Sequence, residues 1–381
     1  MLKDGHTNVY MPVEVANKLY GVYFGDYRFV LSNIDGQTVV TRINKEKIKE
    51  IPLGTVITEV NGMPTAEYQK KYVKPYISSS TDYIVEDYAA FRLLKAPEGT
   101  KHTVVFRRPD GKEKTLELTC GKEKELALYP EMEEWKRFEF KWLKKGVAYI
   151  SLNSFGSPEI IDMFKKKLPE IYKAKKLVVD LRKNGGGSTS TGLAILQYLT
   201  TDNVFYGSKS RSRLHIPSYK AWGGWAKAED TVGMTNPEGL AWHKQALESA
   251  RDEYYHDFPY SPDSVSLDEK RIKVPTVLLI GHKTASAAED FLILADNQKH
   301  MTKMGERTFG STGQPMVFDL PGGGSARVCT KQDLYPDGRE FIGVGVLPDI
   351  EVKKTLEDFI KDRDPGLKAA LKFLKEQDRA L

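Results

Sequence analysis

The sequence predicts an α/β protein in two parts: a core built on a buried, largely parallel sheet, and a small β-rich module that precedes it. Residues 176–188 and 274–291 predict the core, because each runs from a continuous apolar strand through a glycine turn into a helix. Residues 19–121 predict the module, because short β-rich runs alternate there with turn signals such as Asn61-Gly62 and Asp110-Gly111.

These patterns divide the chain into an N-terminal segment, 1–18, the β-rich module, 19–121, and a core domain, 122–381. In the module, strands are expected at about 21–24, 27–31, 38–43, 55–60, 103–107 and 114–118, with a helix at 85–95. In the core, an edge strand is expected within 122–144, further strands at 146–152, 316–320 and 326–330, and helices at 160–173 and 355–381.

An insertion at about 202–271 interrupts the alternation of strands and helices in the core. It is rich in tyrosine and tryptophan, including Tyr219, Trp222 and Trp242. A long aromatic excursion between two strands of a sheet suggests a lid that shapes a binding cleft. The alternative is a self-packed subdomain that lies away from the site.

The composition is that of a globular protein, with 381 residues, 40% hydrophobic residues and a net charge of +5. The basic residues are dispersed, which argues against nucleic-acid binding, and no run of eighteen apolar residues predicts stable membrane insertion. Cys120 and Cys329 are either free thiols or one disulfide. The abrupt start of the chain suggests that an N-terminal segment, including an export signal, has been removed.

Ser286 lies where a buried strand gives way to a helix, and we predict that it is a catalytic nucleophile. The unpaired backbone N–H groups of a helix start can stabilise an oxyanion beside such a serine. The alternative is purely structural, because Ser286-Ala-Ala-Glu289 is also a capping box. The catalytic interpretation therefore requires a base, an orienting acid and a second oxyanion donor elsewhere in the chain.

Three consecutive glycines, Gly185 to Gly187, predict a loop whose backbone N–H groups face an anion. A nucleotide phosphate is disfavoured, because the loop lacks both the Lys-Ser/Thr ending of a P-loop and the spacing of a dinucleotide site. The favoured anion is the tetrahedral oxyanion formed when Ser286 attacks a carbonyl, and a plain structural turn is the alternative. No metal or other cofactor is expected.

Four motifs in order resemble the C-terminal processing peptidase and tricorn family of serine peptidases. They are the proline–glycine–apolar–Asn-Gly segment at 51–62, Asp180-Leu-Arg-Lys-Asn-Gly-Gly-Gly187, Thr284-Ala-Ser-Ala-Ala-Glu289 and Gly345-Val-Leu-Pro-Asp-Ile350. The resemblance implies a crotonase-like α/β core with an attached PDZ-like domain. In that domain the loop of Gly21, Val22, Tyr23 and Phe24 would bind the C-terminal carboxylate of a peptide, and the alternative is that the module binds nothing.

The resemblance also indicates which residue activates the serine. The Ser/Lys branch carries its lysine where this chain has Ser311, so a lysine base is disfavoured. The tricorn-like branch takes a histidine from a motif that Asp4-Gly-His-Thr7 resembles, which makes His6 the expected general base. Glu340 is the expected orienting acid, although alignment on Gly345 places Ile342 there instead. Where tricorn carries a serine before its histidine, this chain has Gly5.

The resulting prediction is a serine endopeptidase that forms an acyl-enzyme, with Ser286, His6 and Glu340 as catalytic residues and the N–H groups of Gly186 and Ala287 as the oxyanion hole. Its partners would be polypeptide substrates, bound through their C-termini, and the resemblance favours an exported bacterial protein. The main alternative is a catalytically inactive peptide-binding or scaffolding homologue. A weaker one is an acyl-transfer enzyme that acts on a thioester.

Overall fold

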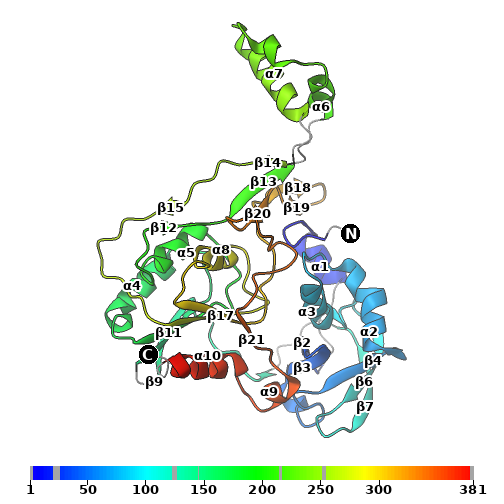
Figure 1. Ribbon diagram of the computed structural model, residues 1–381. Coiled ribbons are helices and arrows are strands. Elements are labelled where there is room, and N and C mark those ends of the chain that lie inside the picture. Colours follow the sequence, from blue (N-terminus) through cyan, green and yellow to red (C-terminus); the bar gives the residue numbers. More distant parts are fainter. Residues whose placement is uncertain are drawn as a thin grey trace.

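The computed structural model describes residues 3–19, 26–121, 127–144, 146–213, 217–250 and 255–377. Its core is a six-stranded sheet with the strand order β21-β17-β16-β11-β10-β9 (Figure 1). The strands are β9 (Phe138–Lys144), β10 (Val147–Leu152), β11 (Lys176–Asp180), β16 (Thr276–Ile280), β17 (Met301–Gly305) and β21 (Ile350–Glu351). All neighbours are parallel except β9, which is antiparallel to β10 and forms the expected edge.

Helices cover both faces of this sheet, which explains why Leu177 to Val179 of β11 and Val277 to Ile280 of β16 are all apolar. Residues Leu177 and Val179 of β11 pack in one cluster with the helices α4 (Glu159–Ile171), α5 (Thr189–Leu196) and α8 (Ala287–Leu294). Val178, between them, faces the other side and packs with α10 (Pro365–Glu376). The alternation along β11 therefore places α8 and α10 on opposite faces.

The expected continuous helix at 355–381 is wrong in one respect, because two helices occupy this region. The first is α9 (Leu356–Ile360), and α10 begins only after a break. The Asp364 carboxylate accepts the Leu367 N–H at 2.9 Å and Pro365 takes the first helical position. An N-cap followed by proline starts a new helix, and proline cannot continue an old one.

The β-rich module contains an antiparallel sheet in the order β2-β3-β4-β6-β7, with β5 paired to β4 and β8 paired to β3. These strands are β2 (Val30–Ile34), β3 (Gln37–Asn44), β4 (Val56–Val60), β5 (Met63–Pro64), β6 (Lys101–Arg107), β7 (Glu113–Thr119) and β8 (Leu128–Tyr129). Its helical elements are η1 (Lys45–Lys47), α2 (Thr65–Tyr68), η2 (Gln69–Val73), η3 (Lys74–Tyr76) and α3 (Asp82–Arg92). Asn61 and Gly62 both have positive φ, as the predicted tight turn between β4 and β5 requires.

A three-stranded sheet joins the N-terminal segment to the strands β18 (Met316–Leu320) and β19 (Gly324–Val328) of the core domain. Here β1 (Asn8–Tyr10) pairs with β19, which pairs with β18. The pairing places Gly5 and His6 next to Phe309 and Ser311, about three hundred positions away in sequence. The next element of the segment is α1 (Val13–Leu19).

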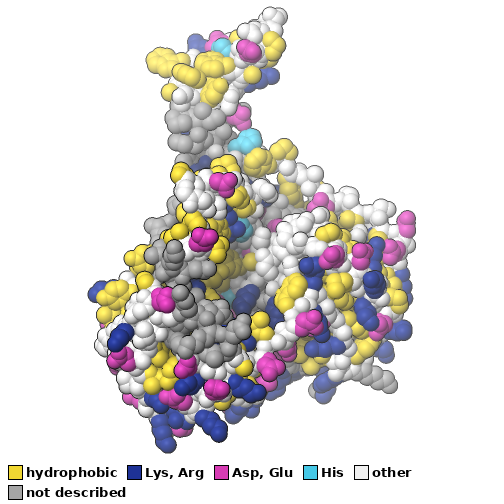
Figure 2. Space-filling view, turned by 180° about the vertical axis from the view of Figure 1, so that it is seen from behind, with side chains coloured by type: hydrophobic (Ala, Val, Ile, Leu, Met, Phe, Trp, Pro, Cys, Tyr) yellow, Lys and Arg dark blue, Asp and Glu magenta, His cyan; other side chains and the backbone are white. Residues whose placement is uncertain are grey.

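The insertion starts and ends in small sheets and carries a helical hairpin that projects from the body (Figure 1). Its elements are β12 (Val204–Phe205), β13 (Lys209–Arg213), α6 (Pro217–Gly223), η4 (Ala228–Thr231), α7 (Pro237–Ala250), β14 (Tyr255–Asp257) and β15 (Asp263–Ser264), and β13 also pairs with β20 (Gln332–Leu334). The rings of Tyr219, Trp222 and Trp242 pack on one another within the hairpin. Figure 2 shows hydrophobic side chains on this projection, and Trp225 is 87% exposed.

Two other expectations concern the whole molecule. Cys120 and Cys329 do not form a disulfide, so the disulfide alternative is wrong. In the part of the chain that the structure describes, no helix has the length and apolar character needed to span a membrane.

Candidate active site

A cavity of about 680 Å³ contains the predicted nucleophile and the predicted base. Ser286 and His6 both line it, with Gly187 from the glycine loop and Asp87 and Tyr88 from α3 of the β-rich module. Of the residues between 202 and 271 that the structure describes, none lines the cavity, so the prediction that the insertion shapes this cleft is not supported. The helical hairpin of the insertion packs its aromatic rings on one another, and β13 joins the insertion to β20.

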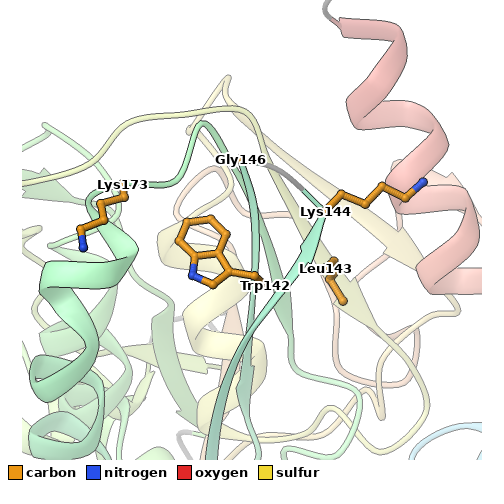
Figure 3. A pocket seen from close by; sticks show the side chains of 5 residues that line it. All are labelled: Trp142, Leu143, Lys144, Gly146 and Lys173. Carbon is orange, nitrogen blue, oxygen red and sulfur yellow. The ribbon is translucent and has the colours of Figure 1, made fainter.

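A second hollow, of about 290 Å³, lies beside the edge strand β9 (Figure 3). It is lined by Trp142, Leu143, Lys144, Gly146 and Lys173. No residue predicted to take part in catalysis lines it. The larger cavity is therefore the candidate site.

Ser286 has an unusual backbone conformation at the junction of β16 and α8. Its φ is 55° and its ψ is −126°, a region that residues other than glycine rarely adopt and that costs on the order of 1–3 kcal/mol. Ser286 and Glu289 have the arrangement of a capping box, but no backbone N–H of α8 donates a capping hydrogen bond to the Ser286 side chain. The Glu289 N–H bonds to the Ser286 carbonyl oxygen instead, at 2.7 Å. Capping therefore does not account for the hydroxyl.

The Glu289 side chain is fully buried and joins the Ser286 turn to the segment 308–311. One carboxylate oxygen accepts hydrogen bonds from the Thr308 hydroxyl and from the Gly310 N–H at 2.7 Å. The other accepts the N–H groups of Ser286 and Ser311, each at 3.1 Å. Burial raises the pKa of Glu289 to about 7, and the four hydrogen bonds oppose that shift. This carboxylate fixes two backbone segments relative to each other.

The His6 ring is held by contacts on its backbone and on its side chain. The His6 N–H donates to Asp4 Oδ1 at 3.0 Å, and the Thr7 hydroxyl donates to the other carboxylate oxygen of Asp4. His6 Nδ1 lies 2.6 Å from the Ser311 hydroxyl oxygen, within hydrogen-bonding distance. Burial, together with the charge of Arg327, lowers the pKa of His6 below 6.5. The ring is therefore neutral at neutral pH, as a general base must be.

The structure does not bring the expected orienting acid, Glu340, to His6. The Glu340 side chain is 59% exposed, and its carboxylate lies 3.8 Å from Arg211 on β13. The partner of His6 Nδ1 is Ser311 instead. Ile342, the other residue suggested by alignment, packs against the hydrophobic core. Glu340 pairs with Leu334 of β20, which pairs with β13, and this arrangement places Glu340 beside Arg211.

The prediction for the oxyanion hole also needs correction at Gly186, because its N–H donates to Asn184 Oδ1 at 2.9 Å. Gly186 acts as a spacer: a Cβ at this position would lie 2.7 Å from the Ser286 Cβ. The neighbouring Gly187 lines the cavity. Among the hydrogen bonds of the described residues, none uses the N–H of Gly187 or of Ala287. These two groups are the better candidates for an oxyanion hole.

No pattern in the sequence indicated a contact between the β-rich module and the end of β16. Asp87 Oδ2 on α3 lies 2.6 Å from Nδ1 of His282, four residues before Ser286. Burial lowers the pKa of His282, but the hydrogen bond and the charge of Asp87 outweigh burial and raise it. Both residues line the cavity, so the β-rich module contributes to its wall. The predicted peptide-binding loop, Gly21, Val22, Tyr23 and Phe24, lies outside the described residues.

The chain belongs to peptidase family S41, since the model of that family matches residues 146–352. It is 24% identical over 301 residues to the chloroplastic C-terminal processing peptidase of Tetradesmus obliquus, covering 78% of this chain and 52% of that protein. It is 27% identical over 241 residues to the carboxyl-terminal-processing protease of Picosynechococcus sp. (strain ATCC 27264 / PCC 7002 / PR-6), covering 62% and 46%. The chain thus spans about half the length of these curated relatives.

The fold is similar to that of mature CPAF, solved in complex with lactacystin. The TM-score is 0.64 at 17% sequence identity, over 98% of this chain and 84% of the other. At this identity the likeness concerns the fold alone, and it agrees with the mixed α/β fold of the S41 family.

Replacing Glu289 by glutamine tests its ionisation. Because folding raises the pKa of Glu289 from 4.5 to about 7, the native state holds the proton more tightly than the unfolded chain does. The resulting stabilisation is complete below pH 4.5 and is lost as the pH rises through about 7. Between about pH 5 and about pH 8, the free energy of unfolding in urea should fall by roughly 1–3 kcal/mol more in the wild type than in Glu289→Gln. Parallel pH profiles for the two proteins would contradict this assignment.

Proposed function

We propose that the protein is a serine endopeptidase that hydrolyses peptide bonds through an acyl-enzyme on Ser286. The observation that carries the proposal is that Ser286, on a strained turn, and a neutral His6 line the same cavity. A strained strand-to-helix turn that exposes a serine is a recurrent design of hydrolytic enzymes. Membership of the S41 family and the names of the relatives support the same activity.

In the proposed reaction, His6 Nε2 takes the hydroxyl proton as Ser286 Oγ attacks the carbonyl carbon of the scissile bond. The N–H groups of Gly187 and Ala287 would donate hydrogen bonds to the resulting oxyanion. His6 then gives the proton to the leaving amine, and the peptide bond breaks to leave an ester on Ser286. Water, deprotonated by His6, hydrolyses the ester and returns the serine to its starting state.

We also propose the finer assignments of fold and substrate. The core would be crotonase-like, and the β-rich module, residues 19–121, would be PDZ-like and present polypeptides to the cavity through their C-termini. The contact of Asp87 with His282 supports a module that works beside the cavity. The names of the curated relatives refer to processing at the carboxyl terminus, which agrees with such substrates. We further propose that the protein is exported by a bacterium and acts in the periplasm or outside the cell.

Labelling with a fluorophosphonate tests the nucleophile. The wild type is expected to take up one label per chain, on the peptide that contains Ser286, and Ser286→Ala is expected to take up none. Ser249→Ala is the matched control, since Ser249 is buried in α7 outside the cavity. Labelling that persists in Ser286→Ala would disprove the role of this serine. A wild type that stays unlabelled would favour the inactive peptide-binding alternative.

Substitution of His6 tests the base. His6→Ala should lower kcat by about a hundredfold or more, whereas His243→Ala, in the projecting hairpin, should leave it unchanged. Because burial and the charge of Arg327 lower the pKa of His6, the midpoint of the acid limb of wild-type kcat/KM should lie below pH 6.5. An acid limb above pH 6.5, or full activity of His6→Ala, would assign the base to another residue.

A further inference from the structure

We propose that Ser311 is the positioning residue of His6: its hydroxyl accepts the Nδ1–H of the imidazole and so keeps Nε2 unprotonated for the Ser286 hydroxyl. The inference rests on the proposed peptidase function and replaces the carboxylate that the sequence led us to expect. In a neutral imidazole one ring nitrogen carries the proton, and the hydrogen bond made by one nitrogen decides the state of the other. The group that contacts Nδ1 therefore decides whether His6 can act as a base.

The contact between these two residues is short and shielded from water. Ser311 Oγ lies 2.6 Å from His6 Nδ1, and Ser311 is completely buried. His6 lines the cavity, whereas Ser311 does not. The hydroxyl thus lies behind the ring, as seen from the cavity, and leaves the other edge of the imidazole for the reaction.

The segment that carries Ser311 is fixed on both sides, so its hydroxyl has little freedom to move. The N–H groups of Gly310 and Ser311 both donate to the buried Glu289 carboxylate. The hydroxyl of the next residue, Thr312, donates to the buried Asp333 at 2.6 Å. A rigidly held hydrogen-bond acceptor constrains the orientation of a catalytic histidine.

Gly5 leaves the space that the Ser311 hydroxyl occupies. A Cβ on Gly5 would lie 2.9 Å from Ser311 Oγ and 2.7 Å from Phe309 Cε1, closer than side-chain atoms normally approach. The Gly5 N–H donates to Ser80 Oγ at 2.9 Å, which fixes the backbone just before His6. A side chain at position 5 and the hydroxyl of Ser311 therefore compete for one place. This chain fills that place with the Ser311 hydroxyl, from a residue 305 positions after His6.

Charged groups near His6 do not explain its orientation, because none of them is the partner of Nδ1. Asp4 and Asp333 favour a protonated ring, and Arg327 disfavours one. Asp4 is occupied by the His6 backbone and Thr7, and Asp333 accepts hydrogen bonds from Ser210, Thr312 and Lys331. A neutral hydroxyl can orient the ring without adding a negative charge that would raise its proton affinity.

The test measures which ring nitrogen of His6 carries the proton, and then measures the effect of that tautomer on kcat. In ¹⁵N-labelled wild type, with the His6 signals assigned by comparison with His6→Gln, the neutral ring should carry its proton on Nδ1. Ser311→Ala should shift the neutral ring toward the Nε2–H form and lower kcat by roughly ten- to a hundredfold, with KM changed less than about twofold. Ser249→Ala, a buried serine outside the site, should change neither quantity.

A wild-type His6 protonated on Nε2 would overturn the proposal, and this measurement needs no variant to fold. An unchanged tautomer together with unchanged kcat in a folded Ser311→Ala protein would overturn it as well. The nitrogen spectra do not depend on catalysis. If the wild type resists fluorophosphonate, the peptidase function fails, while an Nδ1–H tautomer that is lost in Ser311→Ala still supports the positioning role.

Discussion

The carboxylate of Glu289 is the constraint on which the site depends, because it is fully buried and accepts four hydrogen bonds from two separate segments. A buried carboxylate is costly unless such donors surround it, and removing it would leave several donors unpaired. One of its oxygens accepts the N–H groups of both Ser286 and Ser311. The backbones of Ser286, the nucleophile, and of Ser311, the hydrogen-bond partner of the base, are therefore held by the same oxygen of Glu289, although they lie on different loops.

This arrangement also explains how the chain keeps Ser286 in a conformation that L-residues rarely adopt. The positive φ of Ser286 costs on the order of 1–3 kcal/mol, and surrounding contacts must maintain it. Glu289 holds its N–H, and Gly186 allows the glycine loop to approach the Ser286 backbone closely, because any Cβ there would collide with it. The strain and its support are local, so the β16–turn–α8 unit is a rigid platform for chemistry at the hydroxyl.

The sequence predicted the sheet core and most strands of the β-rich module, because continuous apolar runs, turn dipeptides and glycine loops are local signals. It also proposed Ser286 and His6, which the structure brings into one cavity. The sequence-based predictions failed for side-chain contacts between residues that are far apart in the chain. Glu340 has suitable chemistry but pairs with Arg211. Ser311 was visible only as the residue in place of a lysine, and no pattern in the chain could show that its hydroxyl meets His6.

Trapping the acyl-enzyme would show directly whether Ser286 is the nucleophile. The protein would be mixed with an activated acyl ester and quenched in acid within the first turnover. It would then be digested, and the masses of the peptides would be measured by mass spectrometry. We predict an adduct of the acyl group on the peptide that contains Ser286, and no adduct in Ser286→Ala. Turnover of the ester with no adduct on Ser286, or with an adduct on another residue, would contradict it.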